Sequence, residues 1–325
     1  MQFAVQLPTV LRVAKNLRPA LAVANEHVRK VLRNFFPFFV SRGVVQISAF
    51  VDTIIASFLG TGAVSALTYT QSLYTLPVSL FGMSVSAAEL PAMSSAVGSE
   101  DEVAAELRKR LDAGLRQISF FIVPSIVAML ALGDVMVGAL YRTGNFSYDD
   151  VLYVWTILAG SAVGLLPTTL GRLYSSTFYA LHDTRTPFRF AVLHVLLAIA
   201  LGYPAAVYLP PALGVDIRWG AVGLTASAGV AGWIEFLLLR RRLNGRIGRT
   251  GLPLSFAMKL WLAAALAAAL AWALKLALGG PHPIILAALV LVPYGLLYFV
   301  LTSLSGLPEA RQVVNRLTRM LPGRR

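Results

Sequence analysis

Long hydrophobic runs alternate with short basic ones from about Phe35 to about Ser303, and no stretch between them is long enough to fold as a water-soluble domain. A run of about 18 or more nearly uncharged residues is typical of a membrane span. Hydrophobic residues make up 57% of the chain and charged residues 13%, and the mean hydropathy is +0.70. Such values are far from globular averages, so the pattern predicts an all-α, polytopic transmembrane helix bundle.

The hydrophobic runs predict eight membrane spans. They are Phe36–Leu59, Ala63–Met93, Gly114–Leu140, Val151–Leu181, Thr186–Leu209, Trp219–Leu239, Leu254–Leu278 and Pro283–Ser303. Because the second contains Pro77 and ends at Pro91, it is either one kinked helix or a helix followed by a re-entrant segment. The spans divide the chain into a basic lead-in over residues 1–34, a six-helix lobe over 35–243, a two-helix extension over 244–305 and a basic tail over 306–325.

Basic residues gather in every second connection between the spans. One set of connections contains clusters such as Arg108–Arg110 and Arg240–Arg242, whereas the opposite set contains only Arg142 and Arg218. The positive-inside rule places the basic set in the cytoplasm. We therefore expect a multi-pass membrane protein with both termini in the cytoplasm.

Several classes of function are disfavoured by what the chain lacks. It has no Cys, and its four His residues show no metal-ligand spacing, so neither a disulfide framework nor a metal or cofactor site is predicted. Phosphate-loop, nucleophile-elbow and zinc-protease motifs are also missing, which argues against an enzyme. Although the net charge is +13, the basic residues lie at the span edges rather than on one folded face, so nucleic-acid binding is not expected.

Polar and ionisable residues inside the predicted spans are the main functional signal, because such groups are costly in lipid and usually face a bundle interior or a watery cavity. We assign a substrate pathway to Gln46, Ser48, Asp52, Gln71, Ser72 and Arg172. For Asp52 and Arg172 the alternative is a structural buried pair. Glu89 and Glu235 lie nearer the basic span ends, where water can reach them, and His194 is expected to be a helix-packing residue.

Small residues and prolines indicate how the helices pack. Gly160 and Gly164 form a GxxxG pair, and Gly220, Gly223, Gly229 and Gly232 permit close approach of another helix; all are packing signals. Prolines interrupt several spans, and bent helices around a polar centre favour a transporter. Between the fourth and fifth spans, HDTRTP at His182–Pro187 predicts a turn in which Thr186 caps the next helix.

Four collinear segments carry a family resemblance. They are GVVQISAFVDTIIASFLGTGAVSALTY at Gly43–Tyr69, LYTLPVSLFGMSVSAAELPAM at Leu73–Met93, LYRTGNFS at Leu140–Ser147 and FYALHDTRTP at Phe178–Pro187. With these segments, the chain from about Arg33 onward resembles the MurJ/MviN family of lipid II flippases. The resemblance implies a fourteen-helix fold of the multidrug/oligosaccharidyl-lipid/polysaccharide exporter type. Such a protein turns the undecaprenyl-linked peptidoglycan precursor across the bacterial cytoplasmic membrane by alternating access.

The resemblance covers only the last eight helices of the family pattern. We therefore expect either that the chain is part of a longer protein or that a six-helix amino-terminal lobe is a separate chain. The partners implied are lipid II, membrane lipids and that missing lobe. Alternatives are an exporter or antiporter of another amphiphile, and a non-transporting membrane scaffold for cell-wall synthesis.

Some residues depart from the family pattern. Gln71 and Ser72 stand where the family commonly has an acidic residue and then an essential Arg, so Arg172 is the better cationic candidate here. Asp52 matches a position implicated in a Na⁺ site in some members. The other ligand positions fall at Ala198, Gly202 and Ala228, so a complete Na⁺ site is not expected.

The last two spans would in the family line a hydrophobic groove for the polyprenyl tail. In this chain they are rich in Ala and Leu, which is equally typical of ordinary bilayer-facing helices. Lys259 and Lys275 lie near their ends, where we expect both side chains to extend toward the headgroups.

Overall fold

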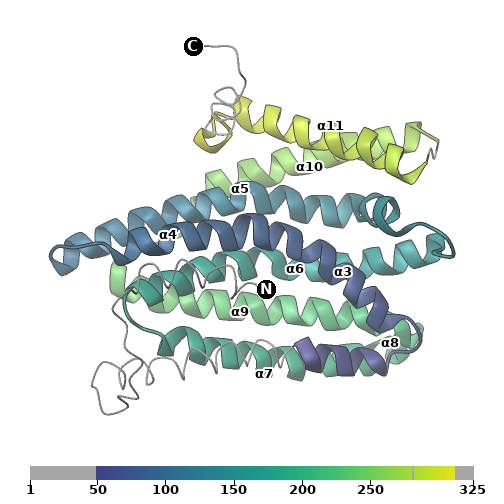
Figure 1. Cartoon of the computed structure of the whole chain (residues 1–325), viewed down its shortest axis with the longest axis horizontal. Helices are drawn as coiled ribbons and strands as arrows, with labels where there is room; N and C mark the ends of the chain where they lie inside the picture. The colour runs from purple at the N-terminus through teal and green to yellow at the C-terminus, as the bar shows by residue number, and fades with distance from the viewer. Residues whose placement is uncertain (1–48, 280–281, 312–325) are drawn as a thin grey trace, which may run out of the picture. The chain divides into compact units, whose positions relative to one another are not determined.

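The computed structural model describes residues 49–279 and 282–311, which belong to one compact unit, Ser41–Arg325, and whose regular elements are all helical (Figure 1). Seven helical stretches in this part are long and apolar enough to cross a membrane: Ala63–Ser94, Glu100–Tyr141, Tyr148–Ala180, Arg185–Val207, Ile217–Ile247, Leu254–Ala277 and Pro283–Leu304. They confirm the second to eighth predicted spans and the all-α membrane fold. Of the first predicted span only the last part is described, and residues 49–57 are helical.

The second span is one continuous helix rather than a helix and a re-entrant segment. α3 (Ala63–Pro77) passes into a π-helical turn, η1 (Val78–Met83), and then into α4 (Ser84–Ser94). Wider π-helical turns are rare and are tolerated where neighbouring helices support them. Here the support is α6 (Tyr148–Ala180), because a Cβ added to Gly82 would lie 2.9 Å from Thr169 Cγ2.

α5 (Glu100–Tyr141) is longer than the span predicted from Gly114, because the polar residues 100–113 belong to the same helix. Its start is fixed by a capping box in which Ser99 and Glu102 each accept a hydrogen bond from the other's backbone N–H. Near its far end the helix kinks at Leu132, whose φ and ψ are −126° and 15°. The indole of Trp155 donates to Met129 O at 3.0 Å beside this kink, so α6 supplies a donor where the helix is irregular.

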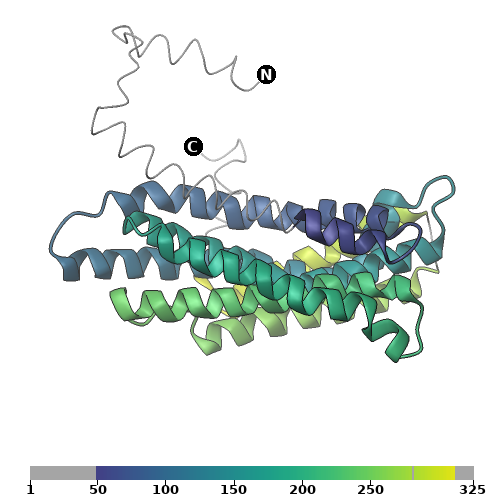
Figure 2. The same ribbon diagram turned by 90° about the horizontal axis from the view of Figure 1, so that it is seen from below.

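α7 (Arg185–Val207) and α9 (Gly220–Ile247) lie side by side, joined by α8 (Leu209–Ala212) and η2 (Ile217–Trp219) (Figures 1 and 2). Close backbone approach at glycines confirms the predicted packing. A Cβ on Gly220 would lie 2.0 Å from Ala206 O on α7. On the α6 side, a Cβ on Gly164 would lie 2.9 Å from the Cα of Gly229.

The turn before α7 is capped differently from the prediction. Thr186 lies within the helix, and the carboxylate of Asp183 accepts hydrogen bonds from its N–H at 3.0 Å and its hydroxyl at 2.8 Å. Asp183 also pairs with Arg246 of α9 at 2.7 Å. Partial burial raises the pKa of the Asp183 carboxyl, but the hydrogen bonds from Thr186 and the charge of Arg246 outweigh it and hold that pKa below its ordinary value.

α10 (Leu254–Ala277) and α11 (Pro283–Leu304) pack against each other and against α5 (Figure 1). They share a hydrophobic cluster with one side of α5, whereas α3, α4, α6, α7, α9 and the other side of α5 form a second cluster. α5 therefore separates two hydrophobic cores.

The basic connections meet at one end of the helices. Arg108 donates to Ile247 O at 3.3 Å, Asp112 accepts from the N–H of Gly251 at 3.0 Å, and Arg116 pairs with Glu309 at 3.0 Å. In this way the first half of α5 is joined to the end of α9, to the segment before α10 and to the segment after α11. We call this the basic end; its cytoplasmic location stays a prediction.

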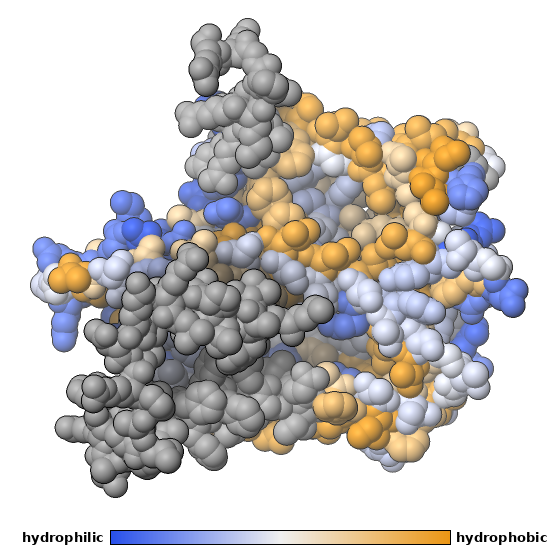
Figure 3. All heavy atoms as spheres, viewed as in Figure 1, coloured by the Kyte–Doolittle hydropathy of each residue, from blue (hydrophilic) through white to orange (hydrophobic). Residues whose placement is uncertain are grey.

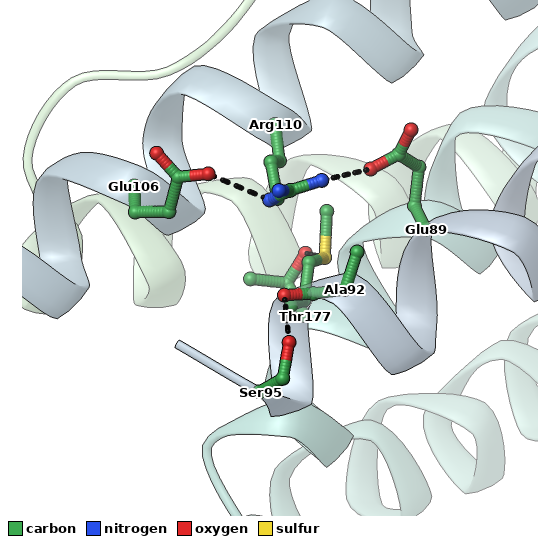
Figure 4. A network of polar contacts seen from close by, with 7 residues as sticks. Glu89, Ala92, Ser95, Glu106, Arg110 and Thr177 are labelled. Atoms are coloured by element: carbon green, nitrogen blue, oxygen red, sulfur yellow. Dashed lines mark hydrogen bonds and ion pairs between the residues drawn. The ribbon is translucent and has the colours of Figure 1, made fainter. Parts of the chain in front are cut away.

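Arg110 joins α4 to α5 at the same end. Its guanidinium lies between Glu106, 2.7 Å away on its own helix, and Glu89 of α4, 3.6 Å away (Figure 4). Glu89 is thus held in an interhelical ion pair near the end of its span, where its charge is compensated.

Candidate functional site

One side of α3 is exposed and polar. Its five members recur at helical spacing and are Ser65, Thr68, Gln71, Ser72 and Thr75; we call this set the polar face. The opposite side of α3 is buried against α6. Figure 3 shows pale and blue side chains over α3, whereas orange, apolar side chains dominate over α10 and α11.

The polar face forms no hydrogen bond to another helix among the residues described. Gln71 donates to Thr75 Oγ1 at 3.3 Å and Ser72 donates to Thr68 O at 3.0 Å, both within α3. From Leu76 onward large apolar side chains join this exposed side, with Leu76, Leu80 and Met83 all exposed. The exposed side of this span is thus polar in the half away from the basic end and apolar toward it.

A second group of ionisable residues comes from three helices. His194 Nδ1 of α7 lies 2.9 Å from Glu235 Oε2 of α9, and both side chains are about a quarter exposed, at 23% and 24%. Asp52, on the helical segment 49–57, is partly buried and lies within electrostatic range of His194. His194 therefore joins α7 to α9, as expected of a helix-packing residue.

Arg172 belongs to a neighbouring group. It is exposed on α6 and lies within electrostatic range of Tyr74, whose hydroxyl contacts Thr168 Oγ1 at 3.3 Å. Among the described residues Arg172 has no ion pair, and none joins it to Asp52. The cation is left available to a partner outside this part of the chain.

Gly232 of α9 lies between the two groups. A Cβ there would be 3.6 Å from His194 Cε1 and 3.8 Å from Thr168 Oγ1. The two groups therefore border one another across a position without a side chain. Gln46 and Ser48, also assigned to the pathway, lie outside the described residues.

Asp134, toward the far end of α5, is a further ionisable residue that was not predicted from the sequence. Its side chain is 5% exposed and its carboxylate lies 2.5 Å from Lys275 Nζ of α10, which also lies 4.5 Å from the centre of the Trp272 ring. Lys275 therefore turns inward, so the prediction that it extends to the headgroups is wrong. The signal was present, because Asp134 is an acidic residue within an otherwise uncharged run.

Metal ligation has no cluster to support it in the part of the chain described. No group of three His, Asp or Glu side chains there is arranged to hold an ion. The arrangement instead offers a polar wall, the cation of Arg172 and a group of ionisable side chains at His194, Glu235 and Asp52.

Comparison with known proteins identifies relatives of this chain. The family model described as lipid II flippase MurJ matches residues 1–304. A probable lipid II flippase MurJ of Haemophilus influenzae is 28% identical over 247 residues, covering 75% of this chain and 46% of the relative. The lipid II flippase MurJ of Burkholderia cenocepacia is 31% identical over 250 residues, covering 76% of this chain and 46% of the relative.

A solved structure has the same fold. It is a lipid II flippase MurJ in an inward closed conformation, with a TM-score of 0.72 and 22% sequence identity, and the match covers 95% of this chain and 60% of that one. The chain spans about half the length of the curated relatives it matches.

Proposed function

The chain belongs to the MurJ family of lipid II flippases, and we propose that it forms the carboxy-terminal lobe and two-helix extension of a transporter that moves lipid II across the bacterial cytoplasmic membrane. In this proposal the chain is not an enzyme, since it moves its substrate without changing it. The observation that carries the proposal is the polar face of α3. A row of exposed hydroxyl and amide groups on a membrane-spanning helix is costly against lipid and suits a water-filled cavity or a second polar protein surface.

The second surface would be a six-helix amino-terminal lobe, in the same polypeptide or as another chain. Alternating access needs two bundles that rock around a site at their interface. The polar face would then be one wall of that site, with Gln71 and Ser72 at its centre and Gln46 and Ser48 contributing from the preceding span.

The residues suit an amphiphilic, anionic substrate. Arg172, which has no ion pair within the described part of the chain, would attract the diphosphate, while hydroxyls and the Gln71 amide offer hydrogen bonds to the sugar and peptide groups. The apolar continuation of the same side, at Leu76, Leu80 and Met83, would contact the beginning of the lipid chain. The Asp52, His194 and Glu235 network would bias the position of the helices around the site.

Rescue of a flippase-depleted bacterium tests the proposal. We expect the 325-residue chain alone to fail and its fusion to a six-helix amino-terminal lobe of a relative to restore growth. Rescue by the chain alone at ordinary expression would contradict the proposal that it is only the carboxy-terminal part of a transporter, and would indicate a homodimer. Failure of a fusion that is stably inserted would contradict the assigned substrate.

Within the rescuing fusion, Asp52→Asn and Arg172→Gln should each lower lipid II translocation while membrane levels stay near normal. The matched control is Leu196→Ala, on the exposed apolar surface of α7. Normal translocation in both charge variants would assign these residues a structural role.

The proposed topology has a separate test, because the chain contains no native Cys. In intact cells a Cys at Asn145 should react with a membrane-impermeant thiol reagent, whereas a Cys at Asn244 should not. Labelling of the Asn244 variant from outside would contradict the cytoplasmic assignment of the basic end.

A further inference from the structure

A pocket of about 490 Å³ lies between α7 and α9 toward the basic end, the two helices running side by side in Figure 2. It is lined by Phe190, Leu238, Arg241, Arg242, Gly245 and Arg246. The α9 members lie three or four positions apart and so share one side of that helix. At Gly245 an added Cβ would meet nothing within 4 Å, so no neighbouring atom fills the space beside this lining residue.

The arginines of this region divide into two kinds. Arg240 donates to Thr250 O at 3.2 Å, and Arg246 pairs with Asp183 at 2.7 Å. Arg241 and Arg242 are exposed and have no ion pair with any described residue, and no acidic side chain is among the residues that line the pocket. Two adjacent cations therefore face the pocket without a counter-charge, an arrangement that an anion would relieve.

The position of the pocket across the bilayer indicates the source of that anion. The apolar run of α9 ends at Leu239, directly before the arginines, so the pocket lies where the hydrocarbon of the bilayer meets the headgroups. Its lining has the same division, since Phe190 and Leu238 are apolar and Arg241 and Arg242 are cationic. Lipid phosphates are the anions concentrated at this depth, and guanidinium groups bind phosphate oxygens in pairs.

We propose that this pocket binds an anionic phospholipid of the adjacent leaflet. Arg241 and Arg242 hold the headgroup phosphate, and the first part of an acyl chain lies against Phe190 and Leu238. The lipid joins the start of α7 to the end of α9. The site is separate from the polar face and needs no substrate transport.

The test uses the full chain in nanodiscs made of phosphatidylcholine with a minor fraction of phosphatidylglycerol. After extraction into mild detergent, the phosphatidylglycerol retained by each protein is measured by native mass spectrometry. Each basic residue near an anionic headgroup contributes roughly a fivefold effect on binding, so Arg241→Gln/Arg242→Gln should lower retention by roughly tenfold or more. Lys109→Gln/Arg249→Gln is the control, because it removes the same charge from exposed positions at the same end but outside the pocket.

Three results would overturn the proposal. Equal loss of lipid in the two double variants would show that retention depends on the total positive charge of this end and not on the pocket. Retention of phosphatidylcholine as strong as that of phosphatidylglycerol would remove the role of headgroup charge. Displacement of the lipid by millimolar inorganic phosphate would make the pocket a site for free phosphate. If the Gln variant does not insert, Arg241→Lys/Arg242→Lys keeps the charge, and we expect it to retain lipid more weakly than the wild type but better than Arg241→Ala/Arg242→Ala.

Discussion

Two groups of described helices are packed by different means: the helices from α3 to α9, which we call the lobe, and the pair α10 and α11, which we call the extension. In the lobe, α9 approaches α6 and α7 so closely that glycines replace side chains at the contacts, as at Gly164, Gly220 and Gly229. The extension places alanines, such as Ala264 and Ala267, inside its core and reaches α5 through directional bonds. Tyr298 donates to Phe120 O and Tyr294 to Pro124 O, each at 2.7 Å.

The directional bonds have a local cause. Pro124 has no N–H to offer Phe120 O, so α5 contains an unpaired carbonyl one turn before the proline. In lipid such a group needs another donor, and the hydroxyl of Tyr298 provides it. Ion pairs then fasten the extension near both ends of α5, Asp134 with Lys275 and Arg116 with Glu309. In the lobe, close helix approach therefore depends on glycines, whereas in the extension side-chain hydrogen bonds and ion pairs to α5 add to a shared hydrophobic cluster.

The largest expected effect comes from breaking the buried ion pair of the extension. Asp134→Ala leaves the ammonium of Lys275 buried without a partner and should lower the free energy of unfolding by about 3 kcal/mol or more. Chemical denaturation in detergent micelles measures this change. Asp134→Ala/Lys275→Met is the control, because it removes both charges and should recover most of the loss. Equal stability of the wild type and Asp134→Ala would show that the pair does not hold the extension.

The second effect should come from filling a glycine contact of the lobe. In Gly220→Ala the new Cβ would lie 2.0 Å from Ala206 O, so α7 and α9 must separate, at a cost of about 1–3 kcal/mol. Gly295→Ala on α11 is the matched control, since a Cβ there meets nothing within 4 Å. It should be neutral or stabilising by up to about 1 kcal/mol because alanine favours the helix. Similar destabilisation by both changes would remove the distinction between the two regions.

A smaller effect is expected from the hydroxyl that compensates for Pro124. Tyr298→Phe leaves Phe120 O unpaired and should cost about 1–2 kcal/mol in unfolding free energy. Pro124→Ala/Tyr298→Phe restores an N–H to α5, so in the double variant the loss should largely disappear. If the two substitutions are simply additive in a double-mutant cycle, the tyrosine does not replace the missing donor.

The smallest effect concerns the ion pair at the basic end of the lobe. Because the folded-state pKa of Asp183 is lowered, its contribution to stability is present above the ordinary value of 3.8 and is lost as the pH falls through the folded-state pKa. Thermal unfolding measured across this acid range should therefore show a steeper loss for the wild type than for Asp183→Asn. Parallel curves would show that Asp183 contributes nothing through its charge.

Hydropathy was sufficient to locate the second to eighth spans, because membrane crossing depends mainly on the length and polarity of each segment. It misplaced the start of α5, since Glu100–Arg110 is polar but continues the same helix. Glycine spacing likewise predicted close packing at Gly164 and Gly220, although not against which neighbour. The contact of His194 with Glu235 and that of Asp134 with Lys275 depend on which helices are neighbours in space, which a list of spans does not contain.

The π-helical turn at Val78–Met83 has a consequence for the order of residues around its span. Buried positions in α3 follow the series Ala63, Ala66, Thr70, Leu73 and Pro77, whereas those that follow are Val78, Gly82, Val85, Ser86 and Met93. The second series is one residue later than the spacing of the first predicts, so the turn accommodates one inserted residue while the same side stays against α6. Removing one residue here would rotate everything after it by about 100° around the helix axis. The buried side of this span therefore follows one helical repeat before the turn and a repeat displaced by one residue after it. A helical wheel drawn through Pro77 without that displacement assigns the residues of α4 to the wrong sides.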